Sequence, residues 1–190
     1  MYEKITLPNG VRIVYEHISE VRSATAGIWV GAGSRNEKSS QGGISHFIEH
    51  MVFKGTDTRS AAEIAGLMDG IGGQVNAYTT KEYTCYYARA LDSHLNVALD
   101  VLCDMFFNSQ FADRDVSTEL GVILEEIDMY KDSPEDLVSE RLFESVFKGT
   151  PLGRPILGKA SSLKKISGAD MKSYMENCYP ADRTVVAVSG

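Results

Sequence analysis

The chain has 190 residues, of which 43% are hydrophobic and 24% are charged, and its formal net charge is -7 at pH 7. A chain of this length can bury a substantial core as one compact domain, and its composition excludes a disordered or low-complexity protein. The negative charge, without any cluster of Lys and Arg, argues against a nucleic-acid partner.

The first residues, MYEKITLPNGVRIVYEH, lack the basic region and the apolar region of a secretory signal. No apolar run approaches the length of about 18 residues that a transmembrane helix needs, so we expect no membrane association. Three cysteines, Cys85, Cys103 and Cys178, are far apart and form no CxxC motif, which indicates reduced thiols. These features predict a cytoplasmic protein.

The N-terminal part of the chain predicts strands followed by a helix. Residues 4–18 alternate apolar and polar side chains on both sides of Pro8-Asn9-Gly10, which indicates a β-hairpin with a tight turn. Residues 24–34 are almost continuously apolar or small and predict a strand that is buried on both faces. Residues 43–53 predict a helix that is buried nearly all round.

The next segments predict a capped helix and a pair of strands. Residues 60–72 open with Ser60 and carry Glu63 three residues later, a capping box that predicts a helix start. Residues 74–91 are rich in Val, Thr and Tyr, and we expect two strands joined near Thr80-Lys81.

The C-terminal part predicts three helices and a final strand. We expect Asp92 to cap a helix over residues 95–107, and residues 116–131 to form a longer amphipathic helix. Ser133 followed by Pro134 predicts the start of a further helix, because Ser is a preferred cap and Pro a preferred first residue. Residues 184–189 predict the last strand.

This order of elements predicts an α+β fold, with a largely antiparallel sheet and helices packed on one face. The chain stops at Gly190, directly after a strand that would normally lead into another element. We therefore expect residues 1–190 to be a single domain that is truncated, or one half of something larger.

Three polar residues interrupt the apolar stretch GGISHFIEHMVFKGT, residues 42–56. His46, Glu49 and His50 are spaced so that they share one face of a helix. Two imidazoles one turn apart suit a tetrahedral zinc ion, and a neighbouring carboxylate can accept a proton from metal-bound water. The alternative is a pair of hydrogen-bonded histidines without a metal. Burying all three groups unpaired costs several kcal/mol, which favours the metal.

A catalytic zinc site needs a third protein ligand and an open position for water. On a helical wheel for residues 116–131, Glu119 and Glu126 fall within the apolar arc, whereas Glu125 points to the polar side. A carboxylate on a buried face needs a cation, which either a metal or a buried Arg or Lys supplies. Two such acids suit one ligand and one supporting group. The arc is marked by Leu120, Val122, Ile123, Ile127 and Tyr130.

The stretch HFIEH is the inverted zinc motif HxxEH, and HFIEHMVFKGT resembles the start of the pitrilysin/insulinase zinc metallopeptidases. Further stretches resemble this family in the same order: VNAYTTKEYTCYYA, VILEEIDMYKDSPEDLV and PLGRPILG. The likeness is greatest to the bacterial processing-protease branch, which is related to the β-subunit of mitochondrial processing peptidase. Together the matching stretches cover most of the chain.

The resemblance implies a processing-peptidase-like fold, one zinc ion per domain and specific roles for five residues. His46, His50 and Glu126 would be the zinc ligands, because the family's spacing leads from the second histidine to Glu126. Glu49 would be the general base, and Glu119 would support the metal site. Zinc would lower the pKa of its bound water toward about 7, and Glu49 would take the proton and pass it to the departing amine.

The resemblance also implies the substrate and a partner. An extended peptide or unfolded protein segment would bind as an added strand beside Asn76, Ala77 and Tyr78. Family members have two homologous halves, and the second supplies an Arg/Tyr pair that has no counterpart here. We therefore expect an N-terminal, metal-bearing half that needs a homologous C-terminal half or a dimer partner.

The leading hypothesis is thus a zinc-dependent endopeptidase or oligopeptidase, and two alternatives differ from it in class. S-ribosylhomocysteine lyase shares an HxxEH helix, but it uses a catalytic cysteine and a third histidine ligand, for which the sequence shows no context. Structural subunits of this family have lost zinc ligands, which are all present here, although an isolated fragment could be inactive. Ligand types alone also allow cobalt or manganese.

Overall fold

The computed structural model describes residues 1–190. Six strands form one sheet: β1 (Glu3–Thr6), β2 (Arg12–Glu16), β3 (Ser23–Val30), β4 (Gln74–Thr79), β5 (Thr84–Leu91) and β6 (Thr184–Ser189). Their order across the sheet is β1-β2-β6-β3-β5-β4, so β1 and β4 are the edge strands. Only β2 and β6 run parallel, and every other neighbouring pair is antiparallel.

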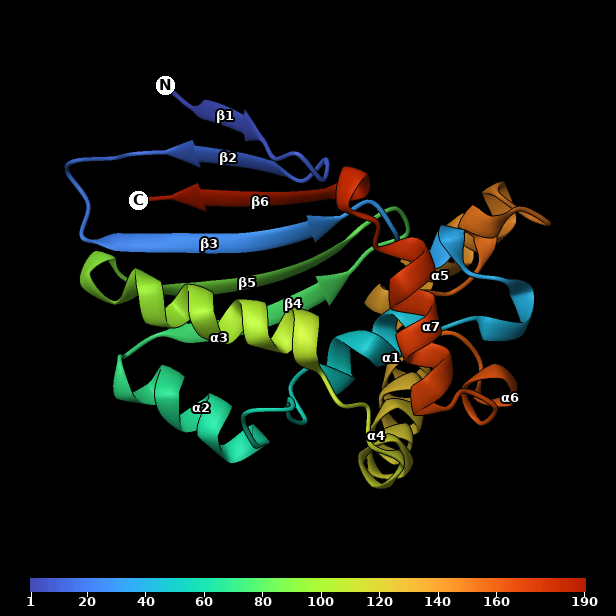
Figure 1. Cartoon of the computed structure of the whole chain (residues 1–190). Coiled ribbons are helices and arrows are strands. Elements are labelled where there is room, and N and C mark those ends of the chain that lie inside the picture. The colour runs from blue at the N-terminus through green and yellow to red at the C-terminus, as the bar shows by residue number, and fades with distance from the viewer.

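The seven α-helices are α1 (Ile44–Met51), α2 (Ala61–Gly70), α3 (Leu95–Asn108), α4 (Asp113–Asp132), α5 (Pro134–Val146), α6 (Ala160–Leu163) and α7 (Gly168–Cys178). Helices α2 and α3 lie along one face of the sheet, and the other helices gather at one end of it (Figure 1). The prediction of an α+β fold with a largely antiparallel sheet is confirmed. None of the helices combines the length and the apolarity needed to cross a membrane.

The two predicted hairpins and the predicted final strand are confirmed. Strands β1 and β2 pair as a hairpin whose turn contains Gly10 at a φ of 95°, a value that glycine adopts without strain. Strands β4 and β5 also pair as a hairpin, with Thr79 opposite Thr84. The final strand lies between β2 and β3, in the interior of the sheet.

Two predicted helix caps are confirmed and one is wrong. The hydroxyls of Ser60 and Ser133 accept hydrogen bonds from backbone N–H groups in the first turns of α2 and α5. Asp92 does not cap α3, which begins at Leu95 without any side-chain cap. Its carboxylate instead accepts a hydrogen bond of 2.8 Å from Arg22, near the start of β3.

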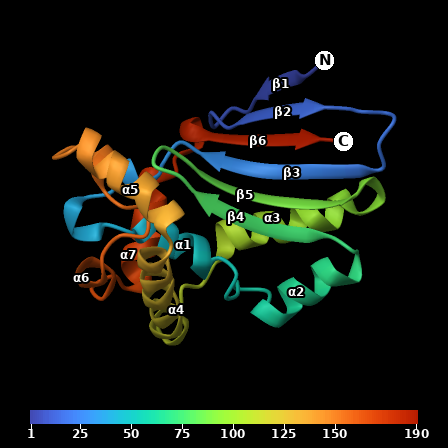
Figure 2. The same ribbon diagram turned by 180° about the vertical axis from the view of Figure 1, so that it is seen from behind.

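The core lies between the helices and one face of the sheet. Ala26, Ile28 and Val30 of β3 are buried on this face. Figure 2 shows the strands from the opposite side, where no helix lies over them. The prediction that β3 is buried on both faces is therefore wrong in part, because Thr25 and Trp29 on the open face are only half-buried. The core residues of α1 include Ile44, Phe47, Ile48 and Met51.

Candidate metal centre

Helix α1 presents its two histidines toward α4. Phe47, Ile48 and Met51 are almost completely buried and fix the remaining faces of this helix in the core. His46 is buried, with an exposed fraction of 7%, and His50 is half-buried. The prediction of a helix buried nearly all round is confirmed, and the packing explains why the two imidazoles point in one direction.

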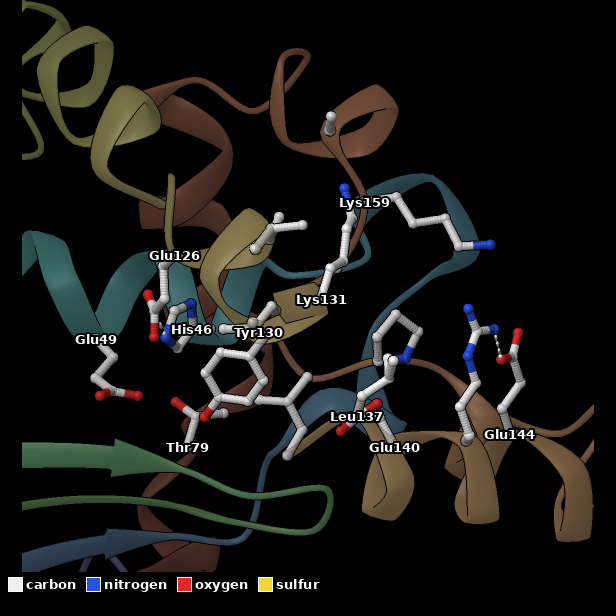
Figure 3. A pocket seen from close by; sticks show the side chains of 18 of the residues that line it. His46, Glu49, Thr79, Glu126, Tyr130, Lys131, Leu137, Glu140, Glu144 and Lys159 are labelled. Atoms are coloured by element: carbon white, nitrogen blue, oxygen red, sulfur yellow. Dashed lines mark hydrogen bonds and ion pairs between the residues drawn. The ribbon is translucent and has the colours of Figure 1, made fainter. Parts of the chain in front are cut away.

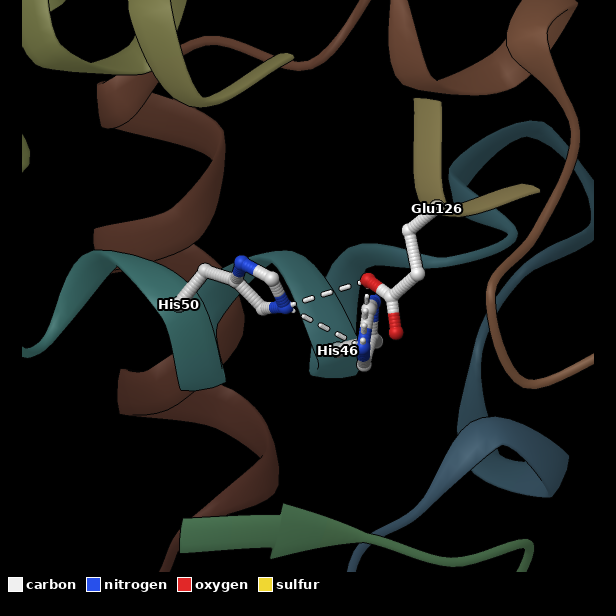
Figure 4. Close-up of side chains that lie close together, drawn as sticks. All are labelled: His46, His50 and Glu126. Atoms are coloured by element: carbon white, nitrogen blue, oxygen red, sulfur yellow. Dashed lines mark hydrogen bonds and ion pairs between the residues drawn. The ribbon is translucent and has the colours of Figure 1, made fainter. Parts of the chain in front are cut away.

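Three ligand atoms meet between α1 and α4 (Figure 4). The Nε2 atoms of His46 and His50 are 3.3 Å apart. An Oε2 atom of Glu126 lies 3.7 Å from the first and 3.5 Å from the second. Ligands at about 2.0–2.1 Å from a tetrahedral zinc ion are separated from one another by about 3.3–3.4 Å. The separations of the three atoms therefore fit one zinc ion.

The hydrogen bonding of these groups fits the same ion. Glu126 Oε2 is buried and has no hydrogen-bond donor within the chain. A buried carboxylate oxygen without a donor is costly, and a cation at the centre of the three ligand atoms would compensate it. Imidazole and carboxylate groups are also among the ligands that zinc prefers.

The other side of the His50 ring contacts Glu119. The Nδ1 atom of His50 lies 2.9 Å from Oε1 of Glu119, and Lys54 Nζ lies 2.6 Å from the other oxygen of this carboxylate. A carboxylate at Nδ1 favours the tautomer with hydrogen at that atom, which leaves Nε2 free toward Glu126. Lys54 was not identified from the sequence, although a lysine four residues after the second histidine of the motif was a possible signal.

Burial and mutual contact shift the pKa values of all three groups in the cluster. Burial lowers the pKa of His46 to about 4, assisted by the charge of His50, so this imidazole is neutral at pH 7. Burial also lowers the pKa of His50, but the carboxylates of Glu126 and Glu119 outweigh burial and raise it overall. The imidazole of His50, whose Nε2 atom lies 3.5 Å from Oε2 of Glu126, lowers the pKa of this carboxyl group. Glu126 is thus held ionised, which is the form that binds a metal.

Glu49 lies beside this cluster without being part of it (Figure 3). It lines the same groove as His46 and Glu126, and its Oε2 atom is buried without a hydrogen-bond partner. Burial raises the pKa of Glu49, and hydrogen bonding by Thr79 opposes the shift. A raised pKa makes this carboxylate a stronger base than an exposed glutamate, which suits a group that takes up a proton. Thr79 was not identified from the sequence as part of the site.

The groove has a volume of about 590 Å³ and extends from the metal cluster toward α5. Strand β4 borders it through Tyr78 and Thr79, and residues 153–160 form another wall. The remaining lining residues come from α4 and α5, and include Ile127, Tyr130, Lys131, Leu137, Glu140, Arg141 and Glu144.

The residues predicted to contact substrate all lie on the edge strand β4. Tyr78 lines the groove and is 39% exposed. Asn76 lines a second pocket of about 510 Å³ between β4 and α2. Ala77 is almost buried, and its N–H donates to the side-chain oxygen of Asn76 over 2.8 Å. Strand β4 therefore runs between two pockets.

The helical wheel of α4 separates its glutamates correctly but makes the apolar arc too wide. Glu119 is 5% exposed and Glu126 is half-buried, whereas Glu125 is exposed. Val122 and Tyr130 were placed on the buried arc, but they are 45% and 38% exposed. Helix α4 lies at the periphery of the molecule and packs mainly against α1 and α5, so only a narrow strip of it is covered (Figure 1).

The chain is similar to curated proteins over nearly its whole length. It is 51% identical over 190 residues to the uncharacterized zinc protease YmxG of Bacillus subtilis, and these residues make up 46% of that protein. It is 43% identical over 185 residues to a probable mitochondrial-processing peptidase subunit beta of Arabidopsis thaliana, covering 97% of this chain and 35% of the plant protein. The chain thus spans less than half the length of these relatives.

Solved structures share the fold. A crystal structure of a protease from Helicobacter pylori matches 99% of this chain and 46% of its own with a TM-score of 0.92 and 24% identity. A peptidase M16 inactive domain from Pseudomonas fluorescens matches all of this chain and 46% of its own with a TM-score of 0.91 and 19% identity. The model of the family described as Insulinase (Peptidase family M16) matches residues 12–160. With the resemblance of its motifs thereby confirmed, the chain belongs to the insulinase family of peptidases.

Proposed function

We propose that this chain is the metal-bearing half of a zinc-dependent endopeptidase or oligopeptidase that hydrolyses extended peptides. The observation that carries the proposal is the meeting of His46, His50 and Glu126 at separations that fit zinc, with Glu49 lining the same groove as His46 and Glu126. The names of the relatives, which are zinc proteases, support it.

Each of these side chains has a proposed role. His46, His50 and Glu126 would hold one zinc ion, and Glu119 would orient His50 through Nδ1. When bound, zinc would supply a Lewis acid that polarises the scissile carbonyl and lowers the pKa of water. Glu49 would accept the proton of the attacking water and deliver it to the departing amine, for which its raised pKa is suitable.

The substrate would bind along β4. This strand is an edge of the sheet, so its outer backbone groups can pair with an extended peptide. Tyr78 and Asn76 lie at the two pockets that flank the strand, where alternate side chains of the peptide would enter. Main-chain pairing through Ala77 and its neighbours would give affinity with a loose sequence preference.

The complete enzyme would require a second half. The matched relatives and structures extend beyond the region that this chain covers, and one relative is named as a subunit of a processing peptidase. We propose that a homologous C-terminal half, or a partner subunit, closes the groove over the substrate. A cytoplasmic location in a bacterium remains a prediction.

The test measures zinc content and hydrolysis of a quenched fluorescent peptide on the same samples. Glu49→Gln should retain stoichiometric zinc and lose hydrolysis, because the substitution removes the base and no ligand. The measurement should be made on this chain and on the longer protein that contains it. Persistent cleavage by the variant would exclude Glu49 as the base. Absence of bound metal from the longer wild-type protein would exclude the proposal that the protein is a metalloenzyme.

The second candidate function is a metal-binding fragment without activity of its own. It is favoured by the short span of the chain, which covers 46% of the Bacillus relative. In that case the 190-residue chain would bind zinc and leave the peptide intact, and activity would appear when the second half is supplied. Activity of the isolated chain would exclude this candidate.

A further inference from the structure

Glu37 lies in the segment that leads into α1, and its side chain reaches the start of that helix. It is 3% exposed. One carboxylate oxygen accepts a hydrogen bond of 2.8 Å from the N–H of Gly43, and the other accepts one of 2.9 Å from the N–H of Ser45. The N–H groups at the start of a helix have no partner within it, and Gly43 has no side chain to cap them. Glu37 therefore caps α1 from outside the helix.

A second contact holds the same turn from α7. The hydroxyl of Ser45 lies 3.0 Å from the hydroxyl of Tyr174, and both residues are buried. Ser45 directly precedes His46. The turn that carries this candidate ligand is thus held through its backbone by Glu37 and through a side chain by Tyr174.

A third set of contacts joins this turn to the wall of the groove. Arg154 donates a hydrogen bond of 2.5 Å to the backbone oxygen of Glu37, and Ser162 donates one of 2.7 Å to the backbone oxygen of Gly42. A side chain at Gly158 would place its Cβ 2.4 Å from that same oxygen of Gly42, so the two segments touch backbone to backbone. Glu37 thus connects α1 with residues 153–160, which line the groove.

Helix α1 depends on such contacts because it is short. Its eight residues are fewer than an isolated helix needs to hold its shape, so packing and end contacts must fix it. His46 sits in its first turn and His50 in its last. A shift of the first turn would therefore move His46 relative to His50 and Glu126, and metal sites tolerate only about 0.5 Å of such displacement.

We propose that Glu37 is a positioning residue of the metal centre. Its hydrogen bonds hold the first turn of α1 in place so that His46 meets His50 and Glu126, and the contact between Tyr174 and Ser45 holds the same turn from α7. This inference rests on the proposed metal site. Burial raises the pKa of Glu37 to about 7, although its hydrogen bonds to the backbone oppose the shift. The ionised form of Glu37 is thus kept in the core although burial disfavours it. The test is best done at pH 8, where Glu37 is ionised.

The test is a titration of the metal-free chain with Co²⁺, whose visible absorption reports the geometry of its ligands. Glu37→Gln preserves the volume, but its NH₂ group faces one of the two N–H donors, so one hydrogen bond is lost. We expect the affinity for Co²⁺ to fall about tenfold, with an altered absorption spectrum, as for other groups that orient metal ligands.

Ser60→Ala is the matched control, because it removes the cap of α2 and touches no part of α1. It should lower the melting temperature and leave both the Co²⁺ affinity and the spectrum unchanged. An equal loss of affinity in Ser60→Ala, or an unchanged affinity and spectrum in Glu37→Gln, would overturn the inference. Should Glu37→Gln fail to fold, Tyr174→Phe decides. We expect a smaller change in the same direction, and an unchanged spectrum would contradict the proposal.

The experiment gives a different result if the chain has no metal site at all. A folded wild-type chain that takes up no Co²⁺ or Zn²⁺ would overturn the proposed function and this inference together. Binding by the wild type with equal affinity in Glu37→Gln would overturn only the role of Glu37.

Discussion

Glu119 of α4 lies 2.9 Å from the Nδ1 atom of His50 and brings Lys54 to the opposite side of its carboxylate, at 2.6 Å. The three side chains form a row from the candidate metal site to the surface. Because Glu119 is only 5% exposed, its carboxylate has little contact with water, and His50 and Lys54 supply its hydrogen bonds instead.

The first prediction concerns Glu119→Gln. The substitution keeps the shape of the side chain but removes the charge that orients and polarises His50. We expect zinc affinity to fall about 10-fold to 100-fold, measured by competition with a chelator of known affinity. Lys54→Gln is the control, because it leaves the contact between Glu119 and His50 in place and should have a smaller effect. Equal zinc affinity in Glu119→Gln and the wild type would refute the orienting role.

The second prediction compares two consecutive residues. Glu126→Gln should weaken zinc binding by more than about 100-fold, because loss of a ligand costs more than loss of a supporting group. Glu125→Gln should leave binding nearly intact, because Glu125 is exposed on the other side of α4. Metal content of the two purified variants, measured together, is decisive. Equal zinc in both would mean that Glu126 is not a ligand.

This pair also shows what sequence patterns can predict. The wheel separated Glu126 from Glu125 because the direction of a side chain depends only on its position along one helix. The capping box of Ser60 and the turn at Gly10 were predictable for the same reason, since each involves neighbours in the chain.

Features that depend on distant contacts were not predictable. Nothing near β6 indicates that it inserts between β2 and β3 and pairs in parallel with β2. Asp92 was wrongly predicted as a cap because its partner, Arg22, is 70 residues away. Val122 was wrongly placed on a buried arc because the wheel shows the direction of a side chain but not whether another element covers it.

The third prediction concerns removal of the metal. Because the ligand atoms converge only in the folded chain, zinc should bind the folded state and raise its stability. Free zinc at 100 times its dissociation constant should stabilise the fold by about 2.7 kcal/mol. This corresponds to a rise of roughly 5–10 °C in Tm for a domain of this size. A chelator should reverse the shift, and Glu126→Gln should show little of it. Identical melting curves with and without zinc would contradict the site.

The fourth prediction concerns a polar cluster between α3 and the segment that follows α1. Asp104 accepts hydrogen bonds from Thr56 over 2.7 Å, from Arg59 over 2.7 Å and from Asn108 over 2.8 Å. Burial alone would raise the pKa of Asp104, but these hydrogen bonds outweigh burial and lower it to about 2. The folded state therefore releases the proton of Asp104 more readily than the unfolded state.

A lowered pKa contributes stability above the unfolded value, near pH 4, which is lost as the pH falls toward 2. The size of the shift corresponds to about 2 kcal/mol. We expect the stability difference between the wild type and Asp104→Asn, measured by urea unfolding, to be largest above pH 4 and to shrink by about this amount at pH 2. Asp100→Asn is the control, since Asp100 pairs with the same Arg59 but is 66% exposed, and exposed pairs contribute about 0–1 kcal/mol. A difference for Asp104→Asn that stays constant from pH 6 to pH 2 would show that the ionisation of Asp104 does not stabilise this cluster.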